Sequence, residues 1–122
     1  MSLLILKAYF QLLKFELYLW QRDFGALYIA VRNEPQKART PISAEQICSA
    51  FDMACIWYWK PVLCLQRSAP ATCLLRRNGL PAQMVLGAQQ VPFRTHAWVE
   101  LFGRVVNDKQ YTPEIYSVLD RC

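Results

Sequence analysis

A thiol, an imidazole and a carboxylate follow one another along this chain, at Cys64, His96 and Asp108. His96 is the single histidine among the 122 residues. Cysteine-dependent acyl transfer needs a nucleophile, a base that activates the nucleophile, and an acid that orients the base. With one imidazole the chain has one way to build such a site, so we predict that Cys64, His96 and Asp108 form it.

The setting of Cys64 differs from that of the other four cysteines. Cys64 follows Pro61 at a place where a helix can begin, and the free N–H groups there favour a thiolate and can hold an oxyanion. The others fall inside expected helices or at the terminus: Cys48, Cys55, Cys73 and Cys122. Five cysteines do not make a closed disulfide set, and one histidine cannot complete a Cys2His2 site. We therefore expect reduced thiols, no metal and no cofactor.

His96 and Asp108 fall on the two arms of an expected hairpin, over 95–101 and 104–107, with Phe102-Gly103 at its turn. Direct pairing of His96 with Asp108 requires a turn centred at residue 102. Facing side chains of an antiparallel pair have Cβ atoms about 4.5–5.5 Å apart, close enough for a carboxylate to hold an imidazole. Alternation along the strand places His96, Trp98 and Glu100 on one face.

Helices are expected before this hairpin. Apolar residues spaced by three or four over 3–32 predict one long helix, or two that are broken near 23–25. Ser43 and Gln46 form a capping box that starts a helix running to about Trp59. The next helix covers 64–77 and stops at Asn78-Gly79, but Pro70 requires a bend there or a start near residue 68.

A further strand is expected over 83–88, and 111–122 is expected to form a tail or a short helix. The predicted class is α+β, with helices followed by a small antiparallel sheet. We expect an N-terminal helical arm and linker over 1–42 and a core over 43–122, packed as one compact unit.

Charge and hydropathy narrow the class of partner. The net charge is +5, and the segment 61–104 holds five arginines against one acid, Glu100. This favours an acidic peptide or protein partner, while the absence of a nucleic-acid motif argues against DNA or RNA. No secretory signal and no uncharged run of ~18–20 residues is present. We expect a cytoplasmic protein, with membrane association through an interfacial amphipathic helix as an open alternative.

Four segments together resemble the lasso peptide biosynthesis B2 proteins, which are leader peptidases with a transglutaminase-like, papain-like core. The segments are CLQRS at 64–68, LLRRNG at 74–79, PFRTHAWVE at 92–100 and GRVVND at 103–108. The Pro-x-x-Cys-Leu approach at 61–65 and the aromatic run at 57–59 also fit. The resemblance covers roughly residues 44–111, and its departures are Pro70 and the N-terminal arm.

The resemblance implies a cysteine protease that removes the leader from a ribosomally made lasso peptide precursor. It makes Cys64 the nucleophile, His96 the base and Asp108 the orienting acid. It also implies a separate leader-recognition protein of the B1 type and a lasso cyclase as partners, since 1–32 is expected to be helical rather than a winged domain. The candidates for oxyanion or substrate contacts are Gln66, Trp57, Trp59 and Trp98.

Two alternatives stay open at this point. The same triad serves a transglutaminase-like acyltransferase that passes the acyl group to an amine. A non-catalytic peptide-binding scaffold of a maturation complex would instead use the apolar arm and the basic stretch as its working surfaces.

Overall fold

The computed structural model describes residues 3–90 and 92–122, so the first two residues of the expected arm lie outside the described part. Four helices come first: α1 (Leu3–Trp20), α2 (Phe24–Asn33), α3 (Ala44–Trp57) and α4 (Cys64–Arg77). They are followed by β1 (Ala82–Gln90), β2 (Phe93–Leu101), β3 (Arg104–Val105), α5 (Thr112–Ile115) and β4 (Ser117–Arg121). The predicted α+β class, with helices before a small antiparallel sheet, is confirmed.

Local signals in the sequence set the ends of the helices. Asp23 caps α2 by accepting a hydrogen bond from the Ala26 N–H at 3.0 Å, which separates α2 from α1. The capping box of α3 forms as predicted, with Ser43 and Gln46 each bonding the other's backbone. Gly79 ends the α4 segment at φ +85°, a left-handed conformation that glycine adopts without a steric penalty.

α4 starts at Cys64 and continues through Pro70, which is buried inside it. The alternative start near residue 68 is therefore wrong. Proline lacks a backbone N–H, so the Gln66 carbonyl has no helical donor four residues on.

The four strands lie in the order β3-β2-β1-β4, and every neighbouring pair is antiparallel. The strand β4 corrects the expectation of a tail or short helix over 111–122, because only 112–115 is helical. Cys122 continues the pairing through two 2.9 Å backbone bonds with Met84. β4 is exposed along its whole length and is held in the sheet by backbone pairing with β1. Because it buries no face, its sequence has no alternation of apolar residues from which a strand could be predicted.

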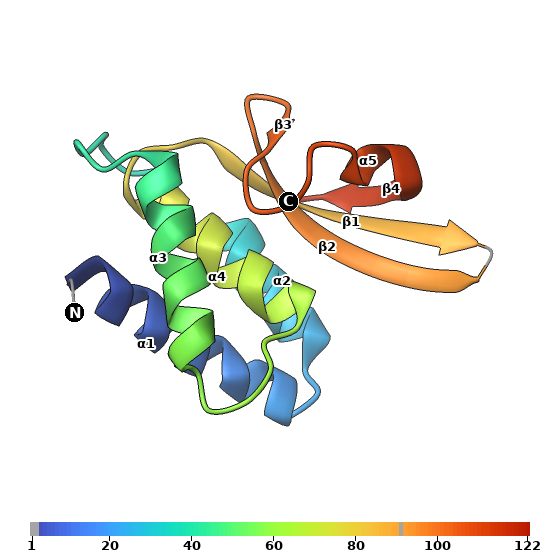
Figure 1. The fold of residues 1–122 in the computed structure, drawn as a ribbon, viewed down its shortest axis with the longest axis horizontal. Coiled ribbons are helices and arrows are strands. Elements are labelled where there is room, and N and C mark those ends of the chain that lie inside the picture. Colours follow the sequence, from blue (N-terminus) through green and yellow to red (C-terminus); the bar gives the residue numbers. More distant parts are fainter. Residues whose placement is uncertain (1–2, 91) are drawn as a thin grey trace.

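The helices cover one face of the sheet, and the hairpin of β1 and β2 extends beyond them (Figure 1). The main core joins α1, α3 and α4 to alternate residues of β2, among them Leu12, Phe51, Leu75 and Val99. The opposite face of the sheet carries a smaller cluster of Val85, Trp98, Val105 and Tyr116. Within the described residues, no helix has the length and apolar character needed to cross a bilayer.

Candidate active site

His96 and Asp108 are brought together as predicted. His96 Nε2 lies 2.5 Å from Asp108 Oδ2, and the two side chains are 24% and 29% exposed. An ionised carboxylate only accepts hydrogen bonds, so the proton of the neutral imidazole resides on Nε2. Nδ1 is then the ring nitrogen that can act as a base.

The Asp108 carboxylate is held on both oxygens. Its second oxygen accepts a bond from the backbone N–H of Lys109 at 2.8 Å. Burial alone would raise the pKa of Asp108, but the bonds from His96 and from the Lys109 backbone outweigh it and lower that pKa overall. Asp108 is therefore ionised at neutral pH and available to orient the ring.

The route by which the chain forms this pair differs from the prediction. The ladder pairs Leu101 with Arg104 and Glu100 with Val105, one residue away from the register that direct pairing of His96 with Asp108 requires. Phe102 and Gly103 both have positive φ, 53° and 77°, which makes a two-residue turn. The chain then leaves the ladder, and a bend at 106–108 carries Asp108 back to His96.

Two aromatic rings lie beside the imidazole and contact each other. The Tyr116 ring stacks on His96 at 5.1 Å between centroids, and the Trp98 ring lies at 6.0 Å. Trp98 is fully buried, and its indole N–H donates to Glu100 at 2.9 Å. The predicted face shared by His96, Trp98 and Glu100 is thus present, and the Trp98 side chain contacts His96, Tyr116 and Glu100.

Gly87 makes room for this aromatic stack. It is the cross-strand partner of His96 on β1. A Cβ at this position would lie 2.7 Å from the Trp98 ring and 2.9 Å from the Tyr116 Cβ. Only a glycine lets both side chains lie this close to the strand.

Cys64 opens α4 and is partly exposed. Burial raises the pKa of the Cys48 and Cys73 thiols to about 11, and it also raises the pKa of Cys55 and Cys122. Among the described residues, no hydrogen bond joins Cys64 to His96. The approach of the sulfur to Nδ1 is therefore part of the proposal below.

A buried clamp ties the Cys64 helix to the segments that carry His96 and Asp108. We give this name to Ser68 and Asn107 with their hydrogen bonds. The Ser68 hydroxyl donates to the Ala97 carbonyl at 3.1 Å and accepts from the Asn107 amide at 3.0 Å. The Asn107 side-chain oxygen also accepts a hydrogen bond from the Val99 N–H at 2.8 Å. It takes the position that the carbonyl of a neighbouring strand would occupy in a continuous sheet.

The clamp is built at an open sheet edge. Because β3 pairs only with Glu100 and Leu101, β2 is an edge strand at Ala97 and its backbone groups are free to bond side chains. Ser68 lies one helical turn after Cys64, Ala97 directly follows His96, and Asn107 directly precedes Asp108. Ser68 and Asn107 are 1% and 9% exposed, and nothing in the sequence pattern marked either one as buried.

The other predicted contact residues form no described hydrogen bond to His96 or Asp108, and Gln66 lines a surface groove together with Cys64. The Gln66 side chain is buried, and its amide donates toward Glu16, the Leu12 carbonyl and the Tyr58 hydroxyl at 2.9–3.3 Å. It therefore faces α1 rather than the His96–Asp108 pair. Trp57 and Trp59 are 64% and 65% exposed at and after the end of α3. Among the described residues, no group of three histidine, cysteine or acidic side chains is arranged to hold a metal.

Comparisons with known proteins agree with this architecture. The Transglutaminase-like superfamily matches residues 11–121, from within α1 to the end of β4. The Microcin J25-processing protein McjB of Escherichia coli is 25% identical over 120 residues, which covers 94% of this chain and 58% of that protein. The chain thus spans little more than half the length of this relative. No solved structure matches it significantly. Since the match covers nearly all of the described fold, the chain belongs to the transglutaminase-like superfamily.

Proposed function

We propose that this protein is a cysteine peptidase that removes the leader peptide from a ribosomally synthesised lasso peptide precursor. The observation that carries the proposal is the 2.5 Å contact between His96 Nε2 and Asp108 Oδ2. The clamp supports it, because Ser68 and Asn107 attach the first turns of the Cys64 helix to the same stretch of β2. The similarity to a microcin-processing protein supports the class of substrate.

In the proposed mechanism, Nδ1 of His96 takes the proton from Cys64, and the thiolate attacks the scissile carbonyl carbon. The oxyanion that forms is stabilised by the backbone N–H of Cys64 at the start of α4. The C–N bond then breaks, and the imidazolium gives its proton to the leaving amine. Water activated by His96 hydrolyses the thioester and restores the thiol. Asp108 keeps the ring in one tautomer and stabilises the imidazolium throughout.

The proposal includes partners and a location. A separate leader-recognition protein of the B1 type would deliver the precursor, and a lasso cyclase would take the released core peptide, all in the bacterial cytoplasm. In the basic segment 61–104, Arg94 and Arg104 are exposed and suited to acidic peptide or protein partners, whereas Arg67 and Arg77 already pair with Asp52 and Glu34. We also propose that residues 43–122 form the catalytic core, to which the helical arm over 1–42 adds its packing face.

The deciding experiment replaces Cys64 by alanine and follows the cleavage of the precursor by mass spectrometry, with the leader-recognition protein present. We expect Cys64→Ala to abolish cleavage and leave thermal unfolding unchanged, since the thiol is partly exposed. Cys55→Ala is the matched control, because it removes another thiol that is not fully buried, and it should cleave normally. Undiminished cleavage by Cys64→Ala would refute the peptidase assignment.

Acyl transfer to an amine is a second candidate, which the superfamily assignment favours. The two reactions share the thioester and differ only in the acceptor. Adding a primary amine to the cleavage reaction distinguishes them, because an acyltransferase yields the amide and a peptidase yields the carboxylic acid. If the protein is instead a non-catalytic scaffold, neither product forms. Cys64 then reacts with iodoacetamide no faster than the other cysteines.

A further inference from the structure

A surface groove of about 770 Å³ lies beside Cys64, at the corner between α1 and α2. Its size falls within the range of roughly 300–1,000 Å³ that ligand pockets occupy. Cys64 itself lines the groove, so any molecule bound there is adjacent to the thiol. His96 and Asp108 do not line it. The groove therefore extends from the nucleophile toward the helical arm.

Large apolar side chains form the outer wall of the groove. Trp20, Phe24 and Leu63 line it and are 78%, 54% and 66% exposed. Side chains this exposed contribute little to the packing of the chain itself. Apolar side chains that gather around one hollow are typical of ligand sites. These three come from the end of α1, the start of α2 and the segment before α4.

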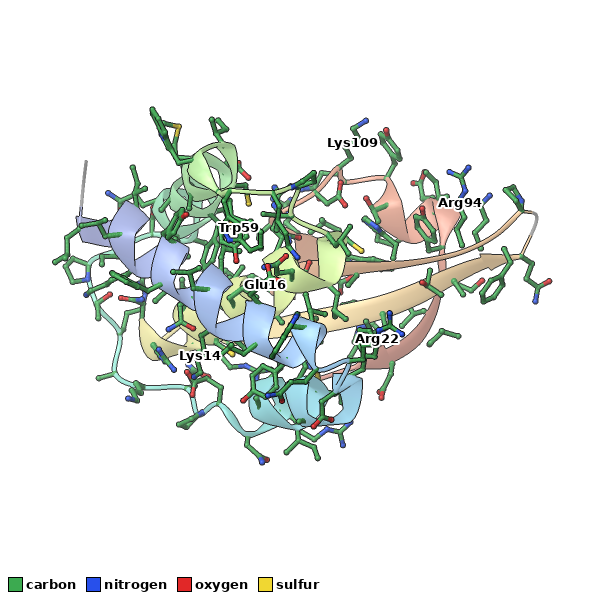
Figure 2. The ribbon with its side chains drawn as sticks, turned by 90° about the horizontal axis from the view of Figure 1, so that it is seen from below. Lys14, Glu16, Arg22, Trp59, Arg94 and Lys109 are labelled. Atoms are coloured by element: carbon green, nitrogen blue, oxygen red, sulfur yellow. The ribbon has the colours of Figure 1, made fainter. Side chains whose placement is uncertain are left out.

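Charge at the rim adds a second element of selectivity. Glu16 and Lys60 also line the groove but neutralise each other through a 2.6 Å ion pair. Arg22 lines it with no ion pair to any described residue, which leaves one unbalanced positive charge. Figure 2 shows Glu16 on α1 and Arg22 at the turn after it.

Arg22 holds an unusual backbone conformation. Its φ is +55°, in the left-handed region that glycine most often occupies after a helix. Side-chain-bearing residues rarely adopt this conformation, and those that do cluster at functional sites. Here the conformation places a guanidinium, instead of a glycine, at the rim of the groove.

We infer that this groove binds the peptide substrate next to its scissile bond, taking a large apolar side chain against Trp20 and Phe24 and an acidic neighbour against Arg22. The inference rests on the proposed function, because it assigns the bound molecule to the Cys64 nucleophile. It gives the α1–α2 corner the role of a specificity subsite.

Peptide electrophiles that alkylate Cys64 test the groove without requiring cleavage. The probes are N-iodoacetyl-Phe-Asp, N-iodoacetyl-Gly-Asp and N-iodoacetyl-Phe-Lys, with iodoacetamide as the reference for intrinsic thiol reactivity. Labelling rates at Cys64 are read by peptide mapping. In each reaction the sulfur displaces iodide and forms a C–S bond.

We expect the Phe-Asp probe to label Cys64 about tenfold faster than the Gly-Asp probe, since burying an aromatic ring is worth at least one factor of ten. Trp20→Ala should bring the two rates together while leaving the iodoacetamide rate unchanged. Phe10→Ala is the matched control, because Phe10 is 65% exposed on the same helix and does not line the groove. Equal rates in the unmodified protein, or a preference that survives Trp20→Ala, would overturn the inference.

The charge is tested with Arg22→Gly, which removes the guanidinium and suits the left-handed backbone. We expect this variant to be at least as stable as the parent and to lose a preference of about threefold for Phe-Asp over Phe-Lys. A preference that persists without the arginine would contradict the inference. Failure of the groove and failure of the peptidase remain distinguishable, because Cys64→Ala abolishes precursor cleavage whether or not these probes discriminate.

Discussion

The His96 ring is held by a hydrogen bond at its edge and by two neighbouring aromatic rings that also contact each other. Asp108 holds Nε2, and Tyr116 and Trp98 restrict the plane of the ring. In the proposed mechanism, a base held in this way is already oriented before it accepts the proton, so its position contributes to the rate. The arrangement also divides the labour, since the carboxylate selects the tautomer and the aromatic rings select the orientation.

Replacing Asp108 by alanine tests the first part of this division. Without the carboxylate, the imidazole has no fixed tautomer and the imidazolium has no counter-charge. We expect kcat for precursor cleavage to fall by roughly 10²–10⁴-fold, with little change in thermal unfolding because the side chain is 29% exposed. Glu114→Ala removes an exposed carboxylate outside the site and should leave kcat unchanged. A normal kcat in Asp108→Ala would exclude Asp108 from the site.

Replacing Gly87 by alanine tests the second part. The new Cβ would lie 2.7 Å from Trp98 and 2.9 Å from Tyr116, so one ring or the strand must move. We expect the free energy of unfolding to drop by about 1–3 kcal/mol and kcat to fall along with it. Gly25→Ala is the control, because its Cβ would meet only the Asp23 carboxylate at 3.9 Å. Gly25→Ala should leave the free energy of unfolding unchanged or raise it. If Gly87→Ala also left it unchanged, the Trp98 and Tyr116 rings would be shown to adapt to the added methyl group.

Between elements, the decisive contacts are those of the clamp. α4, β2 and the bend after β3 are distant in sequence, and Ser68 and Asn107 link all three. Arg67 reinforces the junction, donating to the Asn107 carbonyl at 2.9 Å and pairing with Asp52 at 2.6 Å. The relative positions of Cys64 and His96 therefore depend on two neutral polar side chains inside the protein.

Asn107→Ala should separate positioning from stability. The change leaves the buried Val99 N–H without an acceptor and removes the amide that donates to the Ser68 hydroxyl, which keeps its bond to the Ala97 carbonyl. We expect the free energy of unfolding to fall by about 1–3 kcal/mol. We expect kcat to fall by about 10²-fold, because a displacement of roughly 1 Å at a reacting centre has that effect. Thr72→Ala provides the comparison, since it removes a buried 2.9 Å bond to the Ser68 carbonyl within α4 and leaves the side-chain bonds of Ser68 and Asn107 in place. If both variants lose kcat in proportion to stability, the clamp has no positioning role.

The sequence predicted elements whose signals are local. The Ser43–Gln46 box, the stop at Asn78-Gly79 and the turn at Phe102-Gly103 each need only a few neighbouring residues, and all three formed. The association of His96 with Asp108 followed from the turn, although the register was off by one residue. What escaped prediction depends on non-local partners: β4 pairs with a strand about 30 residues away, and Ser68 and Asn107 are polar types that sequence patterns place at the surface.

Across the whole molecule, the sheet separates two packing regions. The helices and one face of β2 form the main core, while Trp98 and Tyr116 belong to a smaller cluster on the other face. His96 contacts the second cluster, and Cys64 begins α4, whose later residues belong to the first, so the proposed site sits where the two regions meet at the edge of β2. An extended peptide substrate can reach this edge of the sheet, where it would have access to both Cys64 and His96.

Glu16 connects the helical arm to the rest of the fold, and this junction gives stability a defined pH dependence. Its carboxylate accepts bonds from the Tyr58 hydroxyl at 3.0 Å and the Gln66 amide at 2.9 Å, and pairs with Lys60 at 2.6 Å. Burial alone would raise the pKa of Glu16, but these three partners lower it below its ordinary value of 4.5. The ionised form of Glu16 is therefore more stable, relative to the protonated form, in the folded protein than in the unfolded chain.

The sign of the effect follows from that direction. A carboxyl whose pKa is lower in the folded state stabilises fully above its unfolded pKa, and this contribution is lost as the pH falls through the folded pKa. Glu16→Gln keeps the size of the side chain but removes the charge, so it should lower the free energy of unfolding by about 1–2 kcal/mol at neutral pH. Denaturant titrations at neutral pH and below pH 4.5 would measure the difference between the two proteins. We expect that difference to shrink on acidification, and a difference that stays constant or grows would show that the charge of Glu16 does not hold α1 against α3 and α4.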